Sequence, residues 1–263
     1  MRGCAQLNLV FAAYYGGNAI FTGNLHISCV QKGRGETLLF LHGYCSKKES
    51  FYYSIEYFKE NYRTVAPDFP GFGASSPLPA AWSVGDYCLW LQQFMCACGI
   101  SGAHIVAHSF GARVAIKLAA SRPELVKSLV ITGGAGLVKP RTRAYKAKVA
   151  LYRFTKKFAP RFAERRFGSR EYRALPPVMR ASYKKIVNED LREEAKKICA
   201  PALLIYGDGD TVTPADEEGA VFAANISGST LKIIRGGHFC FCENYTEFNE
   251  LVSAFLKGCG RER

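Results

Sequence analysis

The stretch AHIVAHSFG, residues 103–111, decides the fold, because an apolar run ends there in a sharp turn and a helical pattern follows. We read a buried strand that ends near Ala107 and a helix over residues 109–120, with Ser109 at the turn. A serine held at positive φ in so tight a turn brings the two backbones together, so only small residues fit two places before and after it. Ala107 and Gly111 occupy those places. The pattern is therefore a nucleophile elbow, G-x-S-x-G, with alanine in the first glycine position.

Such a turn predicts a site for acyl chemistry. It raises the Ser109 hydroxyl above the sheet, beside the first backbone N–H groups of the following helix. Serine between two small residues also occurs in ordinary turns, so the rest of the chain has to supply a base, an acid and a second oxyanion donor.

Length and composition favour one α/β domain with an insertion, since the chain has 263 residues, 48% of them hydrophobic. The ten cysteines lack the C-x-x-C spacing of zinc sites, so we expect no metal, and buried free thiols in a reducing cytoplasm. No apolar run approaches the roughly 20 residues that span a bilayer. Residues 7–15 faintly resemble a signal peptide, but Gln6 and Asn8 interrupt the pattern, which favours a cytoplasmic location.

The positive charge is concentrated in one segment. Residues 137–200 hold nineteen lysines and arginines against six aspartates and glutamates, an excess equal to the net charge of +13 of the whole chain. Long helical stretches replace the strand pattern there, at residues 144–158, 177–187 and 191–198. We expect a basic helical cap over the carboxyl ends of the strands, inserted between core parts at 1–136 and 201–263.

Strands alternate with helices along the rest of the chain, which predicts a mostly parallel sheet with helices on both faces. A hairpin over residues 19–30 precedes the alternating part. The expected later strands are 37–41, 62–66, 103–107, 126–132, 202–206 and 231–234, and the expected helices outside the cap are 51–59, 83–98, 109–120 and 243–257.

A base and an acid follow the last two strands. His238 lies in a loop with two glycines before it, directly ahead of the final helix, and is the candidate base for Ser109. His42, His104 and His26 lie elsewhere, and strand alternation turns His108 away from its neighbour Ser109. Asp208 and Asp210 both follow a strand. Asp210 is the favoured acid because it is far enough round the turn to face a histidine, whereas Asp208 is placed to stabilise the turn.

An acyl transfer also needs two N–H donors for the oxyanion. One is the backbone N–H of Phe110, directly after the nucleophile, and the other is that of Tyr44, which follows His42 and Gly43 at the end of a buried strand. We interpret His42 as a residue that shapes this loop. The alternative is that His42-Gly43 only ends the strand.

Five motifs together resemble the α/β-hydrolase superfamily in order and spacing. They are LHGY at 41–44, DFPGFGAS at 68–75, AHSFG at 107–111, the pattern G-x-x-D-x-x-x-P at 207–214, and GHF at 237–239. The resemblance covers nearly the whole chain and includes small bacterial esterases and C–C bond hydrolases. It implies the α/β-hydrolase fold, with the basic segment as the cap. Relatives that carry aspartate at the nucleophile position, such as epoxide hydrolases, differ from this chain at Ser109.

The resemblance implies a serine hydrolase that cleaves a carboxylic ester or thioester, with Ser109 as nucleophile, His238 as base, Asp210 as the orienting acid and no cofactor. A C–C bond hydrolase or a cofactor-free perhydrolase would use the same residues, and a small-ligand receptor without activity is a third alternative.

The basic cap has three interpretations. It attracts an anionic substrate such as an acidic ester or a coenzyme A thioester, it rests weakly on an anionic membrane through residues 144–158, or it is a solvated helix face. Nucleic-acid binding is not expected, because no reader motif accompanies the charge.

Overall fold

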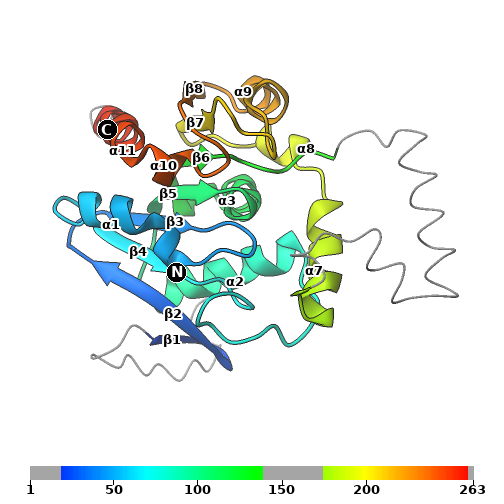
Figure 1. Ribbon diagram of the computed structural model, residues 1–263. Helices are drawn as coiled ribbons and strands as arrows, with labels where there is room; N and C mark the ends of the chain where they lie inside the picture. Colours follow the sequence, from blue (N-terminus) through cyan, green and yellow to red (C-terminus); the bar gives the residue numbers. More distant parts are fainter. Residues whose placement is uncertain (1–18, 139–173, 260–263) are drawn as a thin grey trace, which may run out of the picture.

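Side chains of the central strands alternate between two layers of helices. In a computed structural model that describes residues 19–138 and 174–259, Leu39 and Leu41 pack with one helical layer, whereas Leu38 and Phe40 pack with the other. All four side chains are buried, as expected for a strand covered on both faces. Figure 1 shows α1 and α11 on one side of the sheet and α3 on the other.

The eight strands form one sheet in the order β1-β2-β4-β3-β5-β6-β7-β8. β1 pairs antiparallel with β2 and β2 with β4, and the remaining neighbours are parallel. The strands are β1 (Ala19–Thr22), β2 (Leu25–Lys32), β3 (Thr37–Leu41), β4 (Arg63–Pro67), β5 (Ala103–His108), β6 (Val126–Thr132), β7 (Ala202–Gly207) and β8 (Thr230–Ile234).

The register of β5 sets the position of the elbow. Ala107 lies opposite Leu41 of β3 and His108 lies opposite Thr132 of β6, so three strands end together at one edge of the sheet. The carboxyl ends of parallel strands are where sites form in such sheets, and Ser109 is the first residue beyond β5.

The helices cover both faces of the sheet. α2 begins with a capping box, in which the Ser83 hydroxyl accepts from the Asp86 N–H and the Asp86 carboxylate accepts from the Ser83 N–H. The helices are α1 (Tyr52–Phe58), α2 (Val84–Ala97), α3 (Phe110–Ser121), α7 (Pro177–Val187), α8 (Arg192–Ala195), α9 (Ala220–Asn225), α10 (Cys240–Glu243) and α11 (Tyr245–Cys259), with short helical turns at Lys48–Phe51, Pro123–Leu125 and Ala215–Gly219.

The α/β-hydrolase fold expected from the sequence is confirmed, and three helices differ in detail. α8 is shorter than the expected 191–198, because the N–H groups of Lys197 and Ile198 bond to carbonyls three residues back and tighten the last turn. The expected final helix at 243–257 corresponds to α11, and the short helix α10 precedes it, with Asn244 between them in a non-helical conformation. α9 was not expected, since six residues are too few to show a helical period.

Of the segment between β6 and β7, residues 133–138 and 174–201 are described, and α7 lies at the expected residues 177–187. The expected helix at 144–158 lies outside the described residues, and the domain boundaries stay predictions. Within the described ranges, no helix is long and apolar enough to cross a membrane. Cys29, Cys88 and Cys240 are buried thiols as expected, whereas Cys45, Cys96 and Cys199 are exposed, so the expectation of burial was wrong for these three.

Candidate active site

Ser109 lies at a strained turn between β5 and α3. Its φ of 51° and ψ of −108° fall in a region that residues other than glycine rarely adopt, at a cost of about 1–3 kcal/mol. Gly111 explains the spacing of the motif, since a Cβ there would lie 2.3 Å from the Leu41 carbonyl oxygen. The start of α3 therefore presses against the end of β3, and the turn holds the hydroxyl clear of the sheet.

The structure brings Ser109, His238 and Asp210 together from three places in the chain. His238 Nε2 lies 3.1 Å from Ser109 Oγ, and His238 Nδ1 lies 2.9 Å from Asp210 Oδ2. A carboxylate only accepts hydrogen bonds, so Nδ1 carries the proton and the lone pair of Nε2 faces the hydroxyl. This is the tautomer that a base for Ser109 requires.

Asp210 is held as an anion by its neighbours. Oδ1 accepts from the N–H groups of Val212 and Thr213 at 2.8 and 2.9 Å, and Oδ2 accepts from the Thr213 hydroxyl at 2.8 Å as well as from His238. Burial raises the pKa of Asp210, but the bonds from His238 and Thr213 outweigh it and lower the pKa to about 2. The carboxylate is therefore ionised at neutral pH.

Side chains outside the three-residue array fix the loop that carries His238. Asp208 Oδ1 accepts from the Gly236 N–H at 2.9 Å, which is the turn-stabilising place that the sequence indicated for Asp208. Glu243 Oε2 accepts from the Gly237 N–H at 2.5 Å. Both bonds hold the backbone of the loop directly before the imidazole.

The two expected oxyanion donors belong to residues that directly follow Gly43 and Ser109. A Cβ on Gly43 would lie 3.4 Å from the Cβ of Ser109, so the backbone leading to Tyr44 passes close to the serine. Phe110 is the first residue of α3, where an N–H has no acceptor within the helix. Their roles as donors stay predictions.

His42 holds the loop that leads to Tyr44. Its Nε2 accepts from the Phe69 N–H at 3.0 Å, and its Nδ1 therefore donates to the Gly43 carbonyl at 2.7 Å. Complete burial lowers the pKa of His42 to about 4, against the opposing effects of Gly43 and Asp68. A neutral ring with both nitrogens bonded to backbone is a structural residue, in line with the loop-shaping interpretation.

Asp68 was quoted in a motif, but sequence reasoning gave it no role. The carboxylate is fully buried and accepts from the N–H and the ammonium of Lys48 at 2.7 and 2.8 Å and from the Ala74 N–H at 2.9 Å. The loops after β3 and β4 are thereby joined at a buried ion pair. A side chain at Gly73 would collide with this carboxylate, since its Cβ would lie 2.2 Å from Oδ2. Gly73 was therefore the feature of the sequence that could have indicated a closely packed group at this turn.

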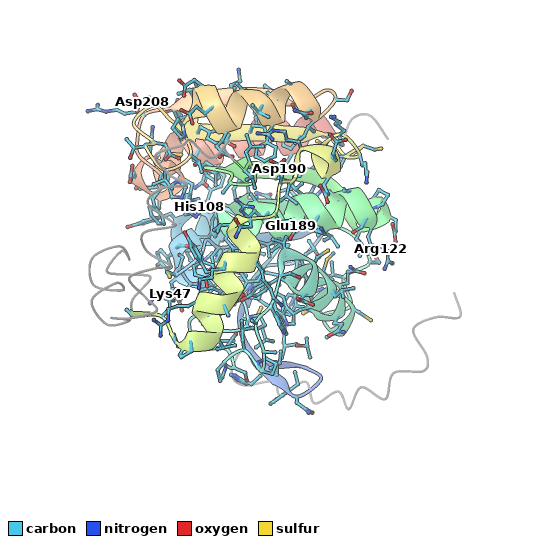
Figure 2. All side chains as sticks on the ribbon, turned by 90° about the vertical axis from the view of Figure 1, so that its right-hand side faces the viewer. Lys47, His108, Arg122, Glu189, Asp190 and Asp208 are labelled. Carbon is cyan, nitrogen blue, oxygen red and sulfur yellow. The ribbon has the colours of Figure 1, made fainter. Side chains whose placement is uncertain are left out.

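α7 lies over the end of the sheet and contacts the nucleophile's surroundings directly. The Tyr44 hydroxyl donates to the Met179 carbonyl at 2.9 Å, and the ring of Tyr183 lies 5.1 Å from that of Tyr44. Arg113 of α3 is buried and donates to the carbonyls of Ile186 and Glu189 at 3.0 and 2.9 Å. Figure 2 shows Glu189 and Asp190 where α7 ends beside α3, with His108 and Arg122 toward opposite ends of α3.

A second serine–histidine–carboxylate array lies elsewhere on the same strands. His104 Nδ1 lies 2.8 Å from Ser128 Oγ, and His104 Nε2 lies 3.5 Å from Glu36 Oε2. Ser128 is fully buried, at the end of the strands away from the elbow, so it is closed to substrate. Within residues 19–138 and 174–259, no group of three His, Cys, Asp or Glu side chains is arranged to hold a metal ion.

Comparison with known proteins places the chain in a family. The family model described as "alpha/beta hydrolase fold" matches residues 36–169, and the chain belongs to this family. It is similar to a 2-hydroxy-6-oxononadienedioate/2-hydroxy-6-oxononatrienedioate hydrolase of Klebsiella pneumoniae, with 30% identity over 88% of this chain and 90% of that protein. These relatives support an enzyme of the α/β-hydrolase type.

Two further relatives differ in their named activities. One is the dihydrolipoyllysine-residue acetyltransferase component of the acetoin cleaving system of Cupriavidus necator, 26% identical over 89% of this chain and 67% of that protein. The other is the solved structure of a membrane phospholipase A, described as a bacterial virulence factor, with a TM-score of 0.75 and 26% identity over 92% of this chain and 85% of that one. The family is therefore established more firmly than any one substrate.

Proposed function

We propose that the protein is a serine hydrolase that cleaves a carboxylic ester or thioester through an acyl-enzyme on Ser109. The observation that carries the proposal is the unbroken chain of contacts from Ser109 Oγ to His238 Nε2 at 3.1 Å and from His238 Nδ1 to Asp210 Oδ2 at 2.9 Å. The strained turn at Ser109 and the anionic state of Asp210 support it.

The reaction has two halves that use the same base. Ser109 Oγ bonds to the substrate carbonyl carbon while its proton passes to His238 Nε2, and the carbonyl oxygen becomes an oxyanion facing the N–H groups of Phe110 and Tyr44. The alcohol or thiol leaves with the proton from Nε2. Water then gives a proton to Nε2 and attacks the acyl carbon, and Ser109 recovers its proton as the acid leaves.

Replacing the nucleophile tests the proposal. Ser109→Ala is expected to abolish hydrolysis of p-nitrophenyl acetate and butyrate and labelling by a fluorophosphonate probe, because within residues 19–138 and 174–259 no other hydroxyl is hydrogen-bonded to His238 Nε2. Ser128→Ala is the matched control: it removes the hydroxyl of the buried array and is expected to leave both readouts unchanged in the folded protein. Equal rates for Ser109→Ala and the parent would remove Ser109 from the mechanism. If the fluorophosphonate probe does not label the parent protein while a ligand still raises its melting temperature, a receptor without activity is favoured.

A C–C bond hydrolase is the second candidate, favoured by the similarity to the nonadienedioate hydrolase. Both functions need the same three residues, so the substrate decides between them. Turnover of a 2-hydroxy-6-oxo-dienedioate, together with p-nitrophenyl ester rates near the uncatalysed rate, would replace the ester proposal by this one.

The basic segment at 137–200 supports an anionic substrate as part of the proposal, since it carries the whole net charge. The rate of association with an acidic ester is expected to fall as the salt concentration rises, whereas the rate with a neutral ester is expected to stay constant. Weak contact with an anionic membrane through residues 144–158 remains the other proposal for this segment. Flotation with anionic liposomes at low salt tests it, and absence from the liposome fraction would contradict it.

A further inference from the structure

His108 is the residue directly before the nucleophile, and its ring packs against the proposed base. It is the last residue of β5 and is 1% exposed. Its ring lies in an aromatic setting, with ring centroids 4.7 Å from His238, 4.9 Å from Phe239 and 4.7 Å from Phe241. The residues it touches belong to the loop of the proposed base and to the helix that follows.

In the part of the chain that the structure describes, the ring makes one polar contact, to the backbone of the proposed base. His108 Nε2 lies 2.9 Å from the His238 carbonyl oxygen. A carbonyl oxygen only accepts, so Nε2 carries the proton. Burial, followed by the nearby His238, lowers the pKa of His108 to about 3, so the ring is neutral and has a single N–H. This N–H donates to the carbonyl oxygen of His238.

The other ring nitrogen faces the loop on the opposite side. Nδ1 is buried and has no hydrogen-bond partner among residues 19–138 and 174–259. The Cβ of a residue other than glycine at position 43 would lie 2.8 Å from this Nδ1. His108 therefore lies between the loop of His238 and the loop that leads to Tyr44, and its backbone continues into Ser109.

The bond to the carbonyl differs from the other anchors of the histidine loop. Asp208 and Glu243 hold the N–H groups of Gly236 and Gly237, which precede the base. His108 holds the carbonyl of His238 itself, from the strand that carries the nucleophile. Only two side-chain torsions separate that backbone from Nε2, so a shift of the carbonyl moves the atom that must receive the Ser109 proton.

We propose that His108 is a positioning residue that sets the distance between Ser109 Oγ and His238 Nε2 by donating from its own Nε2 to the His238 carbonyl. The inference rests on the proposed function of Ser109 and His238. His108 touches no substrate and transfers no proton in this account. Its effect falls on proton transfer and not on substrate binding.

Three substitutions separate the donor from the packing. The side-chain amide of glutamine reaches about as far from the backbone as Nε2 of histidine, whereas that of asparagine reaches only as far as Nδ1. His108→Gln keeps the donor and His108→Asn removes it. His108→Phe fills the aromatic site without a hydrogen-bond donor. It therefore replaces His108→Asn as the variant without a donor if the asparagine variant does not fold.

The readouts are kcat, KM and the rate of fluorophosphonate labelling, each expressed per folded molecule from near-ultraviolet circular dichroism. We expect His108→Asn and His108→Phe to lower kcat and the labelling rate by about 10- to 100-fold at unchanged KM, and His108→Gln to stay within about 3-fold of the parent. Rescue by glutamine is the signature of the donor, because a purely structural role would follow side-chain volume.

Two results would overturn the inference. One is equal kcat per folded molecule for all three variants, and the other is a loss in kcat that only follows the loss of folded protein. Ser109→Ala, measured alongside, separates the inference from the proposed function. If Ser109→Ala is inactive while His108→Phe matches the parent, His108 has no positioning role. If Ser109→Ala is active, the proposed function itself is wrong.

Discussion

Replacing Asp210 by asparagine is expected to reverse the tautomer of His238. The carboxylate accepts four hydrogen bonds: Oδ1 from the N–H groups of Val212 and Thr213, and Oδ2 from the Thr213 hydroxyl and from His238 Nδ1. An asparagine has one acceptor oxygen, so its NH₂ group has to face one of the two pairs of donors.

The two backbone N–H groups cannot reverse, whereas the other two donors can. The amide oxygen therefore stays on the Val212 and Thr213 N–H groups, and the amide NH₂ faces the Thr213 hydroxyl, which turns to accept, and His238 Nδ1. Nδ1 then has to accept as well, which moves the ring proton to Nε2. An Nε2–H donates to Ser109 Oγ and cannot take its proton.

The expected loss in kcat is about 10⁴-fold, the magnitude of the same exchange in serine proteases, or about 5.5 kcal/mol in activation free energy. The assay is kcat for p-nitrophenyl butyrate, together with the rate of fluorophosphonate labelling. KM is expected to change little, because Asp210 is buried behind the imidazole.

Asp208→Asn is the matched control on the same turn. Asp208 is exposed and accepts from the Gly236 N–H, which an amide oxygen also accepts, so its kcat is expected to stay near that of the parent. An Asp210→Asn enzyme that keeps a tenth or more of the parent kcat would refute the tautomer argument. Equal losses in both variants would trace the effect to the turn instead.

Two further predictions follow from burial and close packing. In the unfolded chain, His42 and His108 become protonated below about pH 6.5. In the folded protein, burial lowers their pKa values to about 4 and about 3, so both rings stay neutral to a lower pH. The free energy of unfolding therefore falls by about 1.4 kcal/mol per pH unit for each ring as the pH falls from 6.5 toward 4. Urea unfolding at about pH 5, 6 and 7 measures this slope, and His108→Gln, which lacks one ring, is expected to reduce it; an unchanged slope would contradict the assignment. Gly133→Ala and Gly228→Ala each place a side chain at positive φ, with an expected loss of about 1–2 kcal/mol in the free energy of unfolding. Only the first is expected to lower kcat, because its Cβ would lie 3.1 Å from the His238 carbonyl oxygen and 3.2 Å from Nδ1, while the second has nothing within 4 Å; equal kcat values would contradict the packing argument.

Much of the fold was predictable because its central strands are buried on both faces. Apolar runs such as residues 37–41 and 202–206 are visible in a single sequence, and so is the serine between Ala107 and Gly111. The structure lacks some expected features where local hydrogen bonding decides the outcome, as at α8, whose last turn tightens.

The supporting contacts of the site could not be predicted in the same way. The bond from His108 to the His238 carbonyl joins residues 130 positions apart, and that from the Tyr44 hydroxyl to Met179 joins residues 135 positions apart. Sequence alternation predicted that His108 faces away from Ser109, but it gives no information on which distant backbone atom the ring meets. Such contacts depend on the packing of loops, and a periodic pattern carries no signal for them.

The groups that select the substrate differ from the groups that carry out the reaction. Cleavage of an ester and of a C–C substrate are both expected to use Ser109, His238 and Asp210, so the identity of these residues does not separate the two functions. Selection has to come from groups that face the rest of the substrate. Among the described residues, α7 is the element that reaches the nucleophile's surroundings from outside the sheet, through Met179 and the ring of Tyr183 against Tyr44. Because Tyr44 is also the expected second oxyanion donor, substitutions in α7 that alter substrate preference are expected to act on kcat as well as on KM.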